Sequence, residues 1–588
     1  MKKLIEQIKE EITRAFVQAG YEEKYGNVTV SNRPDLCQYQ CNGALVAAKQ
    51  YKKAPIMIAQ EVVALLENSD SFESITAIAP GFINITLSGA YIADYVSRMA
   101  ECEKYGVEEA KEPKTIIVDY GGPNIAKPLH VGHLRSAIIG ESIKRFGSYM
   151  GHKVIGDAHL GDWGLQMGLI ITECKKRNPE WVYFDDTYTG EYPTEAPFTM
   201  AELEEIYPYA NAYSKEHPEY REEAQNATFL LQSGKRGYKA LWQHILNVSV
   251  ADLKKNYSKL NVEFDLWKKE SDAQPYIADM VADMKANGYA YLSDGALVVD
   301  VKEETDKKEI PPCMILKSDG ATLYNTTDLA TIVERVKLFE PDAITYVVDK
   351  RQELYFEQVF RCAKKTKLVD DNVKLTFLGF GTMNGKDGKP FKTREGGVMR
   401  LETLIQLITD AVYDKVSGRD VPEEEAREIA RKVGVAALKY GDLSNQASKD
   451  YVFDIERFSS FEGNTGPYIL YTIVRIKSIL NKYKESNGEL PKGTRLLAPE
   501  KDSETGLMLE LAKFNDMMEN AFEENAPHKM CQYIYELSNA FARFYHENKI
   551  IAEEDKECQS SWIALITLTK DVLETCVDLL GMEAPDRM

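Results

Sequence analysis

Residues 114–151 read KTIIVDYGGPNIAKPLHVGHLRSAIIGESIKRFGSYMG. The first seven residues form a β-branched apolar run, which is typical of a buried strand in a parallel sheet. A segment rich in glycine and proline follows. Ile139, Ile143, Phe146 and Met150 then recur on one helical face, and Gly151 is a favourable residue for ending the helix. A strand, a Gly/Pro turn and a helix predict the start of a βαβ unit.

Two later segments continue the strand pattern. AITYVVD (343–349) and VKLTFLGFG (373–381) are again rich in β-branched and aromatic residues. Between about 175 and 310 the sequence shows a loop and then polar helical patterns instead. This middle part is therefore interpreted as an insertion that separates the two halves of one α/β domain.

The length of 588 residues is too great for a single hydrophobic core. We expect a small α+β domain at 1–110, because helical patterns there precede short strands bounded by Pro80 and Gly81. The α/β domain spans 111–400, including the insertion. Residues 401–450 are predicted to form a helical connector, and 451–588 a domain built entirely of helices.

Composition limits the class of protein. No apolar stretch approaches the roughly 18 residues of a membrane-spanning helix, so no membrane partner is expected. Acidic residues interrupt the first helical pattern, unlike a secretory or transit signal, and we expect a cytoplasmic protein. Nine scattered cysteines fit reduced thiols, and no second pair answers Cys37 and Cys41 as a zinc site would require. The net charge of −20 argues against indiscriminate nucleic-acid binding, although a local basic face remains compatible with it.

The turn before the helix carries side chains suited to phosphate. A helix N-terminus presents free N–H groups and a positive dipole end. His130 and His133 lie three residues apart and can face one ligand, Gly132 leaves space between them, and Lys127 adds a mobile positive charge. Such donors suit a triphosphate whose α-phosphate is attacked and whose pyrophosphate leaves.

Two alternative roles for these histidines stay open. They could form half of a metal site, although no glutamate lies between them and no third ligand is evident. They could also have a structural role and hold the loop. The dinucleotide-binding pattern G-x-G-x-x-G does not follow the strand, and the chain lacks the phosphate-binding pattern G-x-x-x-x-G-K-[ST].

The segment PNIAKPLHVGHLRS (123–136) closely resembles the signature region of class I aminoacyl-tRNA synthetases, and specifically of arginyl-tRNA synthetases. HVGH corresponds to the HIGH motif of that class. Further similar segments follow in the family's order over nearly the whole chain: NGALVAAKQYKKAPIMIAQEVV, APGFINI, LGDWGLQMG, YVVDKRQ, GKPFKTREGG, IERFSSFEGNTGPYILY and APDRM.

The resemblance implies a multidomain α/β fold. A Rossmann-like catalytic domain with a parallel sheet carries the insertion, the N-terminal domain contacts the tRNA elbow, and the helical C-terminal domain binds the anticodon. It also implies an arginine–tRNA ligase that works in protein biosynthesis. Arginine and ATP give arginyl-adenylate and pyrophosphate, and the arginyl group passes to the terminal ribose 2′-hydroxyl of tRNA(Arg). Mg2+ accompanies ATP, no protein-bound structural metal is expected, and the enzyme is expected to be a monomer.

The resemblance also assigns residues to ATP. His130, His133, Gly132 and Pro123 would lie at the nucleotide and its phosphates. The second signature of the class, KMSKS, aligns here with PFKTREG, so its two lysines fall on Pro390 and Arg394. The resemblance implies that Lys127, upstream of HVGH, compensates for this departure. Lys392 and Arg394 remain candidate loop cations, and the alignment leaves open which of them reaches the phosphates.

Arginine recognition requires carboxylates, because a guanidinium offers five donors and no acceptor. By the family pattern the arginine-binding residues are Asp119, Asn124, His130, Tyr324, Asp328 and Gln352. Asp328 would bind the guanidinium with Tyr324 packed against it, and Asp119 and Asn124 would hold the α-amino end. Many relatives have glutamate at the position of Asp119 and arginine at that of Thr327. A structural alternative makes Asp328 a helix N-cap.

RNA is read largely through unpaired bases stacked on aromatic side chains. Tyr468, Tyr471 and Arg475 lie in or beside a basic run and are candidate tRNA contacts, although either tyrosine could instead be a core residue. Three rival functions share parts of this pattern: a small-molecule nucleotidyltransferase, a synthetase-like RNA-binding protein without catalysis, and an arginine-binding regulator. The long insertion and the helical C-terminus argue against the first, and the retained Lys127, His130, His133 and Asp328 against the second. Nothing specific favours the third.

Overall fold

A computed structural model describes residues 1–391, 399–417 and 421–588 of the chain. At its centre lies a parallel sheet of β5 (Thr115–Asp119), β6 (Lys153–Asp157), β10 (Ala343–Asp349) and β11 (Lys374–Phe380), in the order β11-β10-β5-β6. The strands predicted at 114–120, 343–349 and 373–381 are confirmed. So is the α/β class of this domain.

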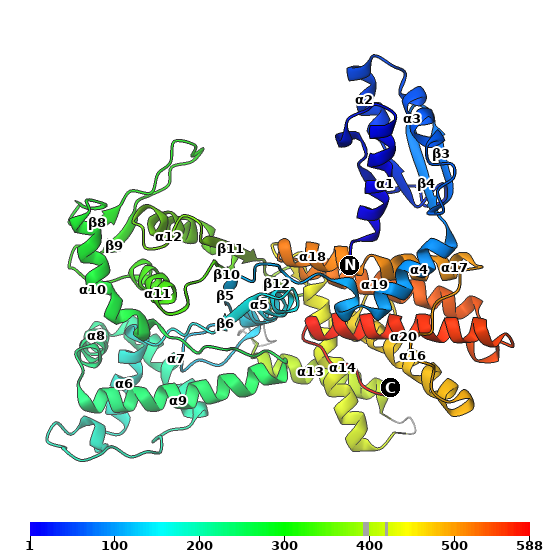
Figure 1. Ribbon diagram of the computed structural model, residues 1–588. Helices are drawn as coiled ribbons and strands as arrows, with labels where there is room; N and C mark the ends of the chain where they lie inside the picture. Colours follow the sequence, from blue (N-terminus) through cyan, green and yellow to red (C-terminus); the bar gives the residue numbers. More distant parts are fainter. Residues whose placement is uncertain (392–398, 418–420) are drawn as a thin grey trace.

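Helices cover both faces of this sheet (Figure 1). Helix α5 (Val131–Tyr149) packs against β5, β6 and β10, whereas α11 (Tyr324–Phe339) and α12 (Glu353–Lys365) lie on the opposite face. The strand period of two explains this division, because Val118 joins the α5 core while its neighbour Ile117 joins the α12 core.

The order of the strands reverses at β5. The chain runs from β5 through α5 to β6 on one side, passes through the insertion, and returns to β10 on the other side of β5. In open α/β sheets, ligands bind in the crevice outside the carboxyl ends of the strands at such a switch point. The fold thus directs attention to the ends of β5 and β10.

The insertion is largely helical, as expected, and also contains a small sheet. Its helices are α6 (Leu165–Arg177), α7 (Met200–Glu216), α8 (Pro218–Gln232), α9 (Arg236–Lys259) and α10 (Glu270–Ala286). Strands β7 (Ala290–Ser293), β8 (Ala296–Val299) and β9 (Cys313–Leu316) form an antiparallel sheet that the sequence patterns did not predict. Two β-bridges, Asp157 to Leu266 and Leu160 to Lys269, fold the insertion back onto the main sheet.

The two ends of the chain form two further parts of the molecule, which are in contact with each other (Figure 1). The N-terminal part combines an antiparallel sheet with helices: β1 (Val28–Val30), β2 (Tyr39–Cys41), β3 (Phe72–Ile78), β4 (Phe82–Leu87), α1 (Leu4–Gln18), α2 (Gly43–Tyr51), α3 (Pro55–Ala64) and α4 (Gly89–Glu101). The C-terminal part is helical, apart from the short strand β13 (Tyr451–Val452), which pairs with β12 (Met383–Asn384). Its main helices are α13 (Leu401–Val416), α14 (Glu423–Leu443), α16 (Gly466–Asn487), α17 (Asp502–Ala512), α18 (Phe514–Glu523), α19 (Pro527–Glu547) and α20 (Lys556–Leu579). Among the residues that the structure describes, no helix is long and apolar enough to cross a membrane.

Candidate active site

The turn between β5 and α5 is tightly fixed at the switch point. Gly121 adopts a positive φ of 65°, and a Cβ on Gly122 would lie 2.0 Å from the carbonyl oxygen of His159, so both positions require glycine. The Ser136 hydroxyl accepts a hydrogen bond from Gly121 N–H (2.8 Å) and donates one to the Val347 carbonyl (2.7 Å). These bonds join the end of β5, the first turns of α5 and β10.

His130 and His133 hold each other at the beginning of α5. His130 is the N-cap residue, and its Nδ1 accepts a hydrogen bond from Gly132 N–H at 3.0 Å. The His130 N–H donates to Nδ1 of His133 at 3.1 Å, and the two ring centroids lie 3.9 Å apart. Because both Nδ1 atoms accept, the proton of each neutral ring sits on Nε2 and is free to be donated to a ligand. The structural role left open by the sequence therefore coexists with a ligand-binding role.

Both imidazoles are held in the neutral form. Burial lowers the pKa of His130, and the charge of Lys127 lowers it further. Burial lowers the pKa of His133 to about 3, and the neighbouring His130 acts in the same direction. Neutral Nε2–H donors need no counter-ion, so the positive charge of this corner comes from Lys127 and the helix dipole.

Lys127 connects this turn with the insertion. Its Nζ lies over the ring of Tyr207 in α7, 4.6 Å from the centroid. An ammonium on an aromatic face keeps its three N–H groups available and is held by a weak, reversible contact. The lysine can consequently move to an anion at the beginning of α5.

Met399 and Arg400, which follow the segment aligned with KMSKS in the sequence, lie at the same turn. Val131 N–H donates to the Met399 carbonyl at 3.0 Å, and a β-bridge pairs His130 with Arg400. Arg400 forms an ion pair with Glu204 of α7 at 2.7 Å. The two candidate loop cations, Lys392 and Arg394, lie outside the described residues.

Asp328 lies on the first turns of α11 and faces the sheet. It accepts a hydrogen bond from the Tyr355 hydroxyl of α12, and burial raises its pKa while that hydrogen bond lowers it. The alternative role as an N-cap is wrong, because α11 begins at Tyr324, four residues earlier, and Leu323 precedes it. Tyr324 itself is 72% exposed and can move onto a ligand.

Glu270, the first residue of α10, is a carboxylate of this region that sequence reasoning missed. Burial raises its pKa to about 7, and the charges of Asp162 and Asp328 raise it while His159 opposes them. Within the described part of the chain, neither Glu270 nor Asp328 forms an ion pair. No sequence signal marks Glu270, because the Leu160–Lys269 bridge alone brings it to the sheet edge.

The remaining candidates for arginine recognition surround the same edge. Asp119 ends β5, and its Oδ2 lies 2.6 Å from Nη2 of Arg335. Asn124 is exposed, follows the β5 turn and forms a β-bridge with Gly161. Gln352 is exposed in the short helix that follows β10. Pro123, the candidate ATP contact, is buried in the same turn.

The three candidate RNA contacts come together on α16. Arg475 donates to the Tyr471 hydroxyl at 2.8 Å, and its guanidinium lies 4.9 Å from the Tyr471 ring and 5.2 Å from that of Tyr545 in α19. Tyr468 donates to Asn539 of α19 at 2.9 Å. Both candidate tyrosines are partly buried, which leaves part of each ring accessible.

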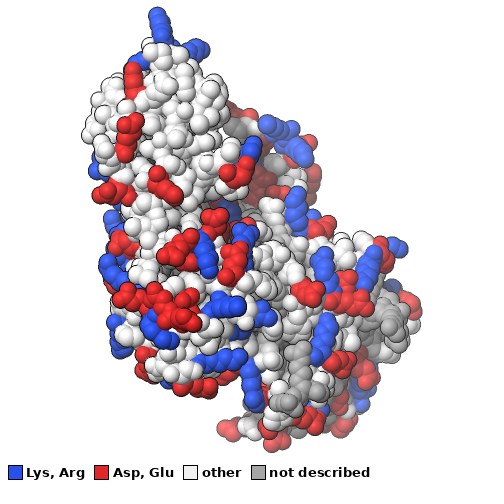
Figure 2. Space-filling model, turned by 90° about the vertical axis from the view of Figure 1, so that its right-hand side faces the viewer, with Lys and Arg blue, Asp and Glu red and all other residues white. Residues whose placement is uncertain are grey.

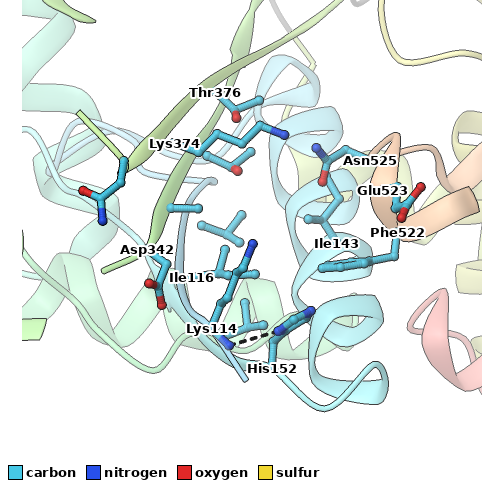
Figure 3. Close-up of a pocket in the computed structure, with 15 residues that line it drawn as sticks. Lys114, Ile116, Ile143, His152, Asp342, Lys374, Thr376, Phe522, Glu523 and Asn525 are labelled. Carbon is cyan, nitrogen blue, oxygen red and sulfur yellow. Dashed lines mark hydrogen bonds between the residues drawn. The ribbon is translucent and has the colours of Figure 1, made fainter. Parts of the chain in front are cut away.

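A cavity of about 800 Å3 lies at the opposite, amino-terminal ends of the strands (Figure 3). Figure 3 shows Lys114 and Lys374 beside it, with Phe522 and Asn525 from the end of α18 and its following turn across the opening. It contains none of the residues expected to bind ATP or arginine. The charged and polar candidates converge at the carboxyl ends of the strands instead.

This geometry agrees with comparisons to known proteins. Residues 96–455 match the family model for the catalytic domain of tRNA synthetases class I (R), residues 469–588 match the DALR anticodon binding domain, and residues 2–87 match the arginyl tRNA synthetase N terminal domain. The parallel sheet with its HVGH turn at the switch point is thus the catalytic domain of a class I aminoacyl-tRNA synthetase.

Full-length relatives identify the family within that class. The chain is 61% identical to the arginine–tRNA ligases of Agathobacter rectalis and Alkaliphilus oremlandii, with complete coverage of both chains in each case. Its fold matches the crystal structure of arginyl-tRNA synthetase from Plasmodium falciparum over the full length of both chains, with a TM-score of 0.81 and 26% identity. The chain belongs to the arginyl-tRNA synthetase family.

Proposed function

We propose that this protein is an arginine–tRNA ligase that forms arginyl-adenylate from L-arginine and ATP and then transfers the arginyl group to the 2′-hydroxyl of the terminal ribose of tRNA(Arg). The observation that carries the proposal is that donors suited to phosphate and carboxylates suited to a guanidinium lie together at the switch point of the sheet. A helix N-terminus with two neutral histidines and Lys127 lies at the same sheet edge as two carboxylates without cation partners among the described residues.

In the first step an oxygen of the arginine carboxylate attacks the α-phosphorus of ATP, and pyrophosphate leaves. His130 and His133 donate Nε2–H to phosphate oxygens, and the backbone at Gly132 and Pro123 lets the nucleotide approach closely. Negative charge grows on the phosphoryl oxygens in the transition state, and these donors are already in place to stabilise it. Lys127, released from Tyr207, adds a full positive charge there, and Lys392 or Arg394 supplies another.

The arginine side chain lies across the ends of β5 and β10. Asp328 and Glu270 accept the N–H groups of its guanidinium, and Tyr324 closes over it. Two adjacent carboxylates repel each other and resist ionisation, so binding is favoured when one guanidinium interacts with both. Asp119 and Asn124 hold the α-amino end, and Gln352 lines the pocket.

Mg2+ enters this reaction with ATP as a counter-ion of its phosphates. In the described ranges no group of three or more histidine, cysteine or acidic side chains could hold a metal ion. Bound to ATP, the ion would reduce the repulsion between the phosphate oxygens and the attacking carboxylate. The protein contributes N–H donors and Lys127.

In the second step the ribose hydroxyl oxygen attacks the arginyl carbonyl carbon, and AMP leaves. The tRNA contacts proposed for the C-terminal domain are Tyr468, Tyr471 and Arg475, on which unpaired bases can stack. Acidic and basic side chains are interspersed on the face seen in Figure 2, whereas the part of the N-terminal domain visible at the top carries fewer of them, with basic side chains at its tip. A net charge of −20 means that the protein repels tRNA phosphates outside the contact face. Salt weakens tRNA binding by screening the contacts of the local cations with those phosphates.

The division into 1–110, 111–400 with its insertion, 401–450 and 451–588 belongs to this proposal, with the first and last parts contacting tRNA. We also propose a cytoplasmic monomer. Gel filtration with light scattering tests the monomer, because a mass near 66.5 kDa is expected.

Pyrophosphate exchange tests the function directly. The purified protein is incubated with ATP, labelled pyrophosphate, each amino acid in turn, and with or without tRNA. Label should enter ATP with arginine and most efficiently when tRNA is present. Exchange supported equally by lysine or glutamine would overturn the assignment of the substrate.

A further inference from the structure

Arg335 is a buried guanidinium next to the proposed arginine pocket. It belongs to α11 and is only 2% exposed. Its Nη2 lies 2.6 Å from Oδ2 of Asp119 and 2.8 Å from Oδ2 of Asp157, and its guanidinium carbon lies 5.4 Å from the centroid of the Tyr346 ring. Asp119 and Asp157 are direct partners in the parallel register of β5 and β6. One internal cation therefore joins the last residues of two adjacent strands.

The same helix face presents Asp328. Asp328, Thr331 and Arg335 are spaced at three and seven residues, which places them along one side of a helix over a rise of about 10 Å. Thr331 Oγ1 lies 3.4 Å from Nε2 of His159, so this side faces the edge of the sheet. Helix α11 consequently carries a carboxylate proposed for the substrate guanidinium and, two turns later, a guanidinium of its own.

Four carboxylates thus lie at this sheet edge: Asp119, Asp157, Asp328 and Glu270. Any of them could attract an incoming guanidinium, because such charge-assisted hydrogen bonds depend on local geometry and not on the identity of the acid. Arg335 neutralises Asp119 and Asp157. Within the described residues Asp328 and Glu270 are left without a cation, and these two define a single position for the substrate.

The contacts of Arg335 are not those that stability alone would favour. Its Nε and Nη1 have no hydrogen-bond partner within the described residues, and only Nη2 bridges the two aspartates. A buried ion pair with unsatisfied N–H groups is often no more stable than apolar packing of the same volume. The presence of a guanidinium at this position is explained better by its positive charge beside the two aspartates than by a contribution to folding stability.

We propose that Arg335 is a positioning residue that determines the register of substrate arginine, by occupying the two carboxylates that would otherwise compete with Asp328 and Glu270. The inference rests on the proposed function, since it concerns where the substrate of that reaction binds. It gives Asp119 the role of holding Arg335 in addition to any contact with the α-amino group.

Arg335→Ala tests the inference in pyrophosphate exchange with saturating tRNA. The variant should raise the arginine KM by about 10-fold or more, while the ATP KM stays within about twofold of the wild-type value. Free guanidinium ion at millimolar concentration should then change the arginine KM of the variant and of the wild type in opposite directions. It should lower the arginine KM of Arg335→Ala by filling the vacated place, and it should raise that of the wild type by competing at Asp328, with potassium chloride matched for ionic strength.

Arg145→Ala is the matched control, because Arg145 also bridges two acids, Glu141 and Asp578, at 2.8 and 3.2 Å but lies on α5 outside the proposed pocket. It should change thermal stability without changing the arginine KM. If Arg335→Ala does not fold, Arg335→Gln keeps a polar side chain at this position but removes the charge that neutralises Asp119 and Asp157, so it should still raise the arginine KM.

The outcomes separate the two proposals. A wild type that exchanges with arginine, together with an unchanged arginine KM in Arg335→Ala or Arg335→Gln, overturns the inference alone. Equal guanidinium inhibition of wild type and Arg335→Ala also overturns it. A wild type that does not exchange with arginine overturns the proposed function, and the inference with it.

Discussion

The backbone N–H of His130 donates a hydrogen bond to Nδ1 of His133 at 3.1 Å, which fixes the proton of the second imidazole on Nε2. The two histidines that cap the beginning of α5 are therefore the same two that offer Nε2–H donors to a ligand. Removing either ring disturbs the cap of α5 as well as the contact with phosphate, so variants at these two positions combine stability and activity effects. Lys127 does not have a comparable structural role in the turn.

Lys127→Ala is expected to slow pyrophosphate exchange by about 100-fold, on the scale of one lost transition-state donor, with an unchanged melting temperature. The control is Lys254→Ala, because Lys254 also lies over an aromatic ring, that of Trp267, at 5.3 Å. It should exchange at the wild-type rate. A normal rate in Lys127→Ala would show that another cation, such as Lys392 or Arg394, assists the departing pyrophosphate.

Asp328→Asn is expected to raise the arginine KM by about 10-fold or more, because an amide keeps the shape of the side chain but removes the charge that pairs with the guanidinium. The ATP KM should stay within about twofold of wild type in the same assay. Asp306→Asn serves as a control, since Asp306 pairs with Arg361 at 2.8 Å in the insertion. An arginine KM unaffected by Asp328→Asn would place the guanidinium elsewhere.

Arginine binding is expected to depend on pH through Glu270. Burial raises its pKa to about 7, and only the ionised carboxylate pairs with a guanidinium. The affinity for arginine should fall by up to about tenfold for each unit that the pH drops below 7, because binding must then expel a proton. Isothermal titration calorimetry from pH 6 to 8 measures this, and Glu270→Gln should flatten the profile. A wild-type affinity independent of pH would exclude Glu270 from the pocket.

Folding stability is expected to decline in acid through His133. Burial lowers the pKa of His133 to about 3 in the folded protein, against 6.5 as the ordinary value. Above pH 6.5 the ring is neutral in both states, and between pH 6.5 and 3 only the unfolded chain takes up the proton. Protonation of this residue in the unfolded chain should thus lower the free energy of unfolding by up to about 2 kcal/mol at about pH 5.

Urea midpoints at about pH 7.5 and about pH 5 test this effect. His133→Asn keeps an acceptor near the position of Nδ1 but cannot titrate, so its midpoint should fall less than that of the wild type over the same interval. Equal losses in the two proteins would assign the acid sensitivity to other groups.

Arg475→Ala is expected to weaken tRNA binding by about 10-fold and to reduce the slope of log Kd against log salt by about one unit. Arginine-dependent exchange at saturating tRNA should be unchanged, because α16 lies away from the catalytic sheet. The control is Arg427→Ala, which removes a guanidinium of α14 that lies 5.1 Å from the ring centroid of Tyr413 in α13. An unaltered Kd in Arg475→Ala would remove this helix face from the tRNA interface.

The sequence predicted those parts of the site that depend on local structure. The β5 strand, the Gly/Pro turn and α5 follow each other directly, so periodicity and turn chemistry were sufficient to place His130 and His133 at a helix start. Asp328 was found only through family resemblance. Its position one turn inside α11, and not at the cap, depends on where the helix begins, which is the least certain feature of a sequence pattern.

Glu270 and Arg335 could not be found in the same way. Glu270 reaches the sheet edge through the bridge between Leu160 and Lys269, a contact between segments that lie far apart in the chain. In the sequence, Arg335 is one of four charged residues of α11, and nothing marks it out until the pairing of β5 with β6 brings Asp119 and Asp157 together beside it. The positions of Glu270 and Arg335 at the site therefore depend on long-range strand pairing and not on local propensity.

A crystal structure of the protein with arginine and a non-hydrolysable ATP analogue tests the central claim most directly. We predict the phosphates at the N-terminus of α5, within hydrogen-bond distance of Nε2 of His130 and His133, and the guanidinium between Asp328 and Glu270. Phosphates bound instead in the cavity beside Lys114 and Lys374, at the amino ends of the strands, would contradict it.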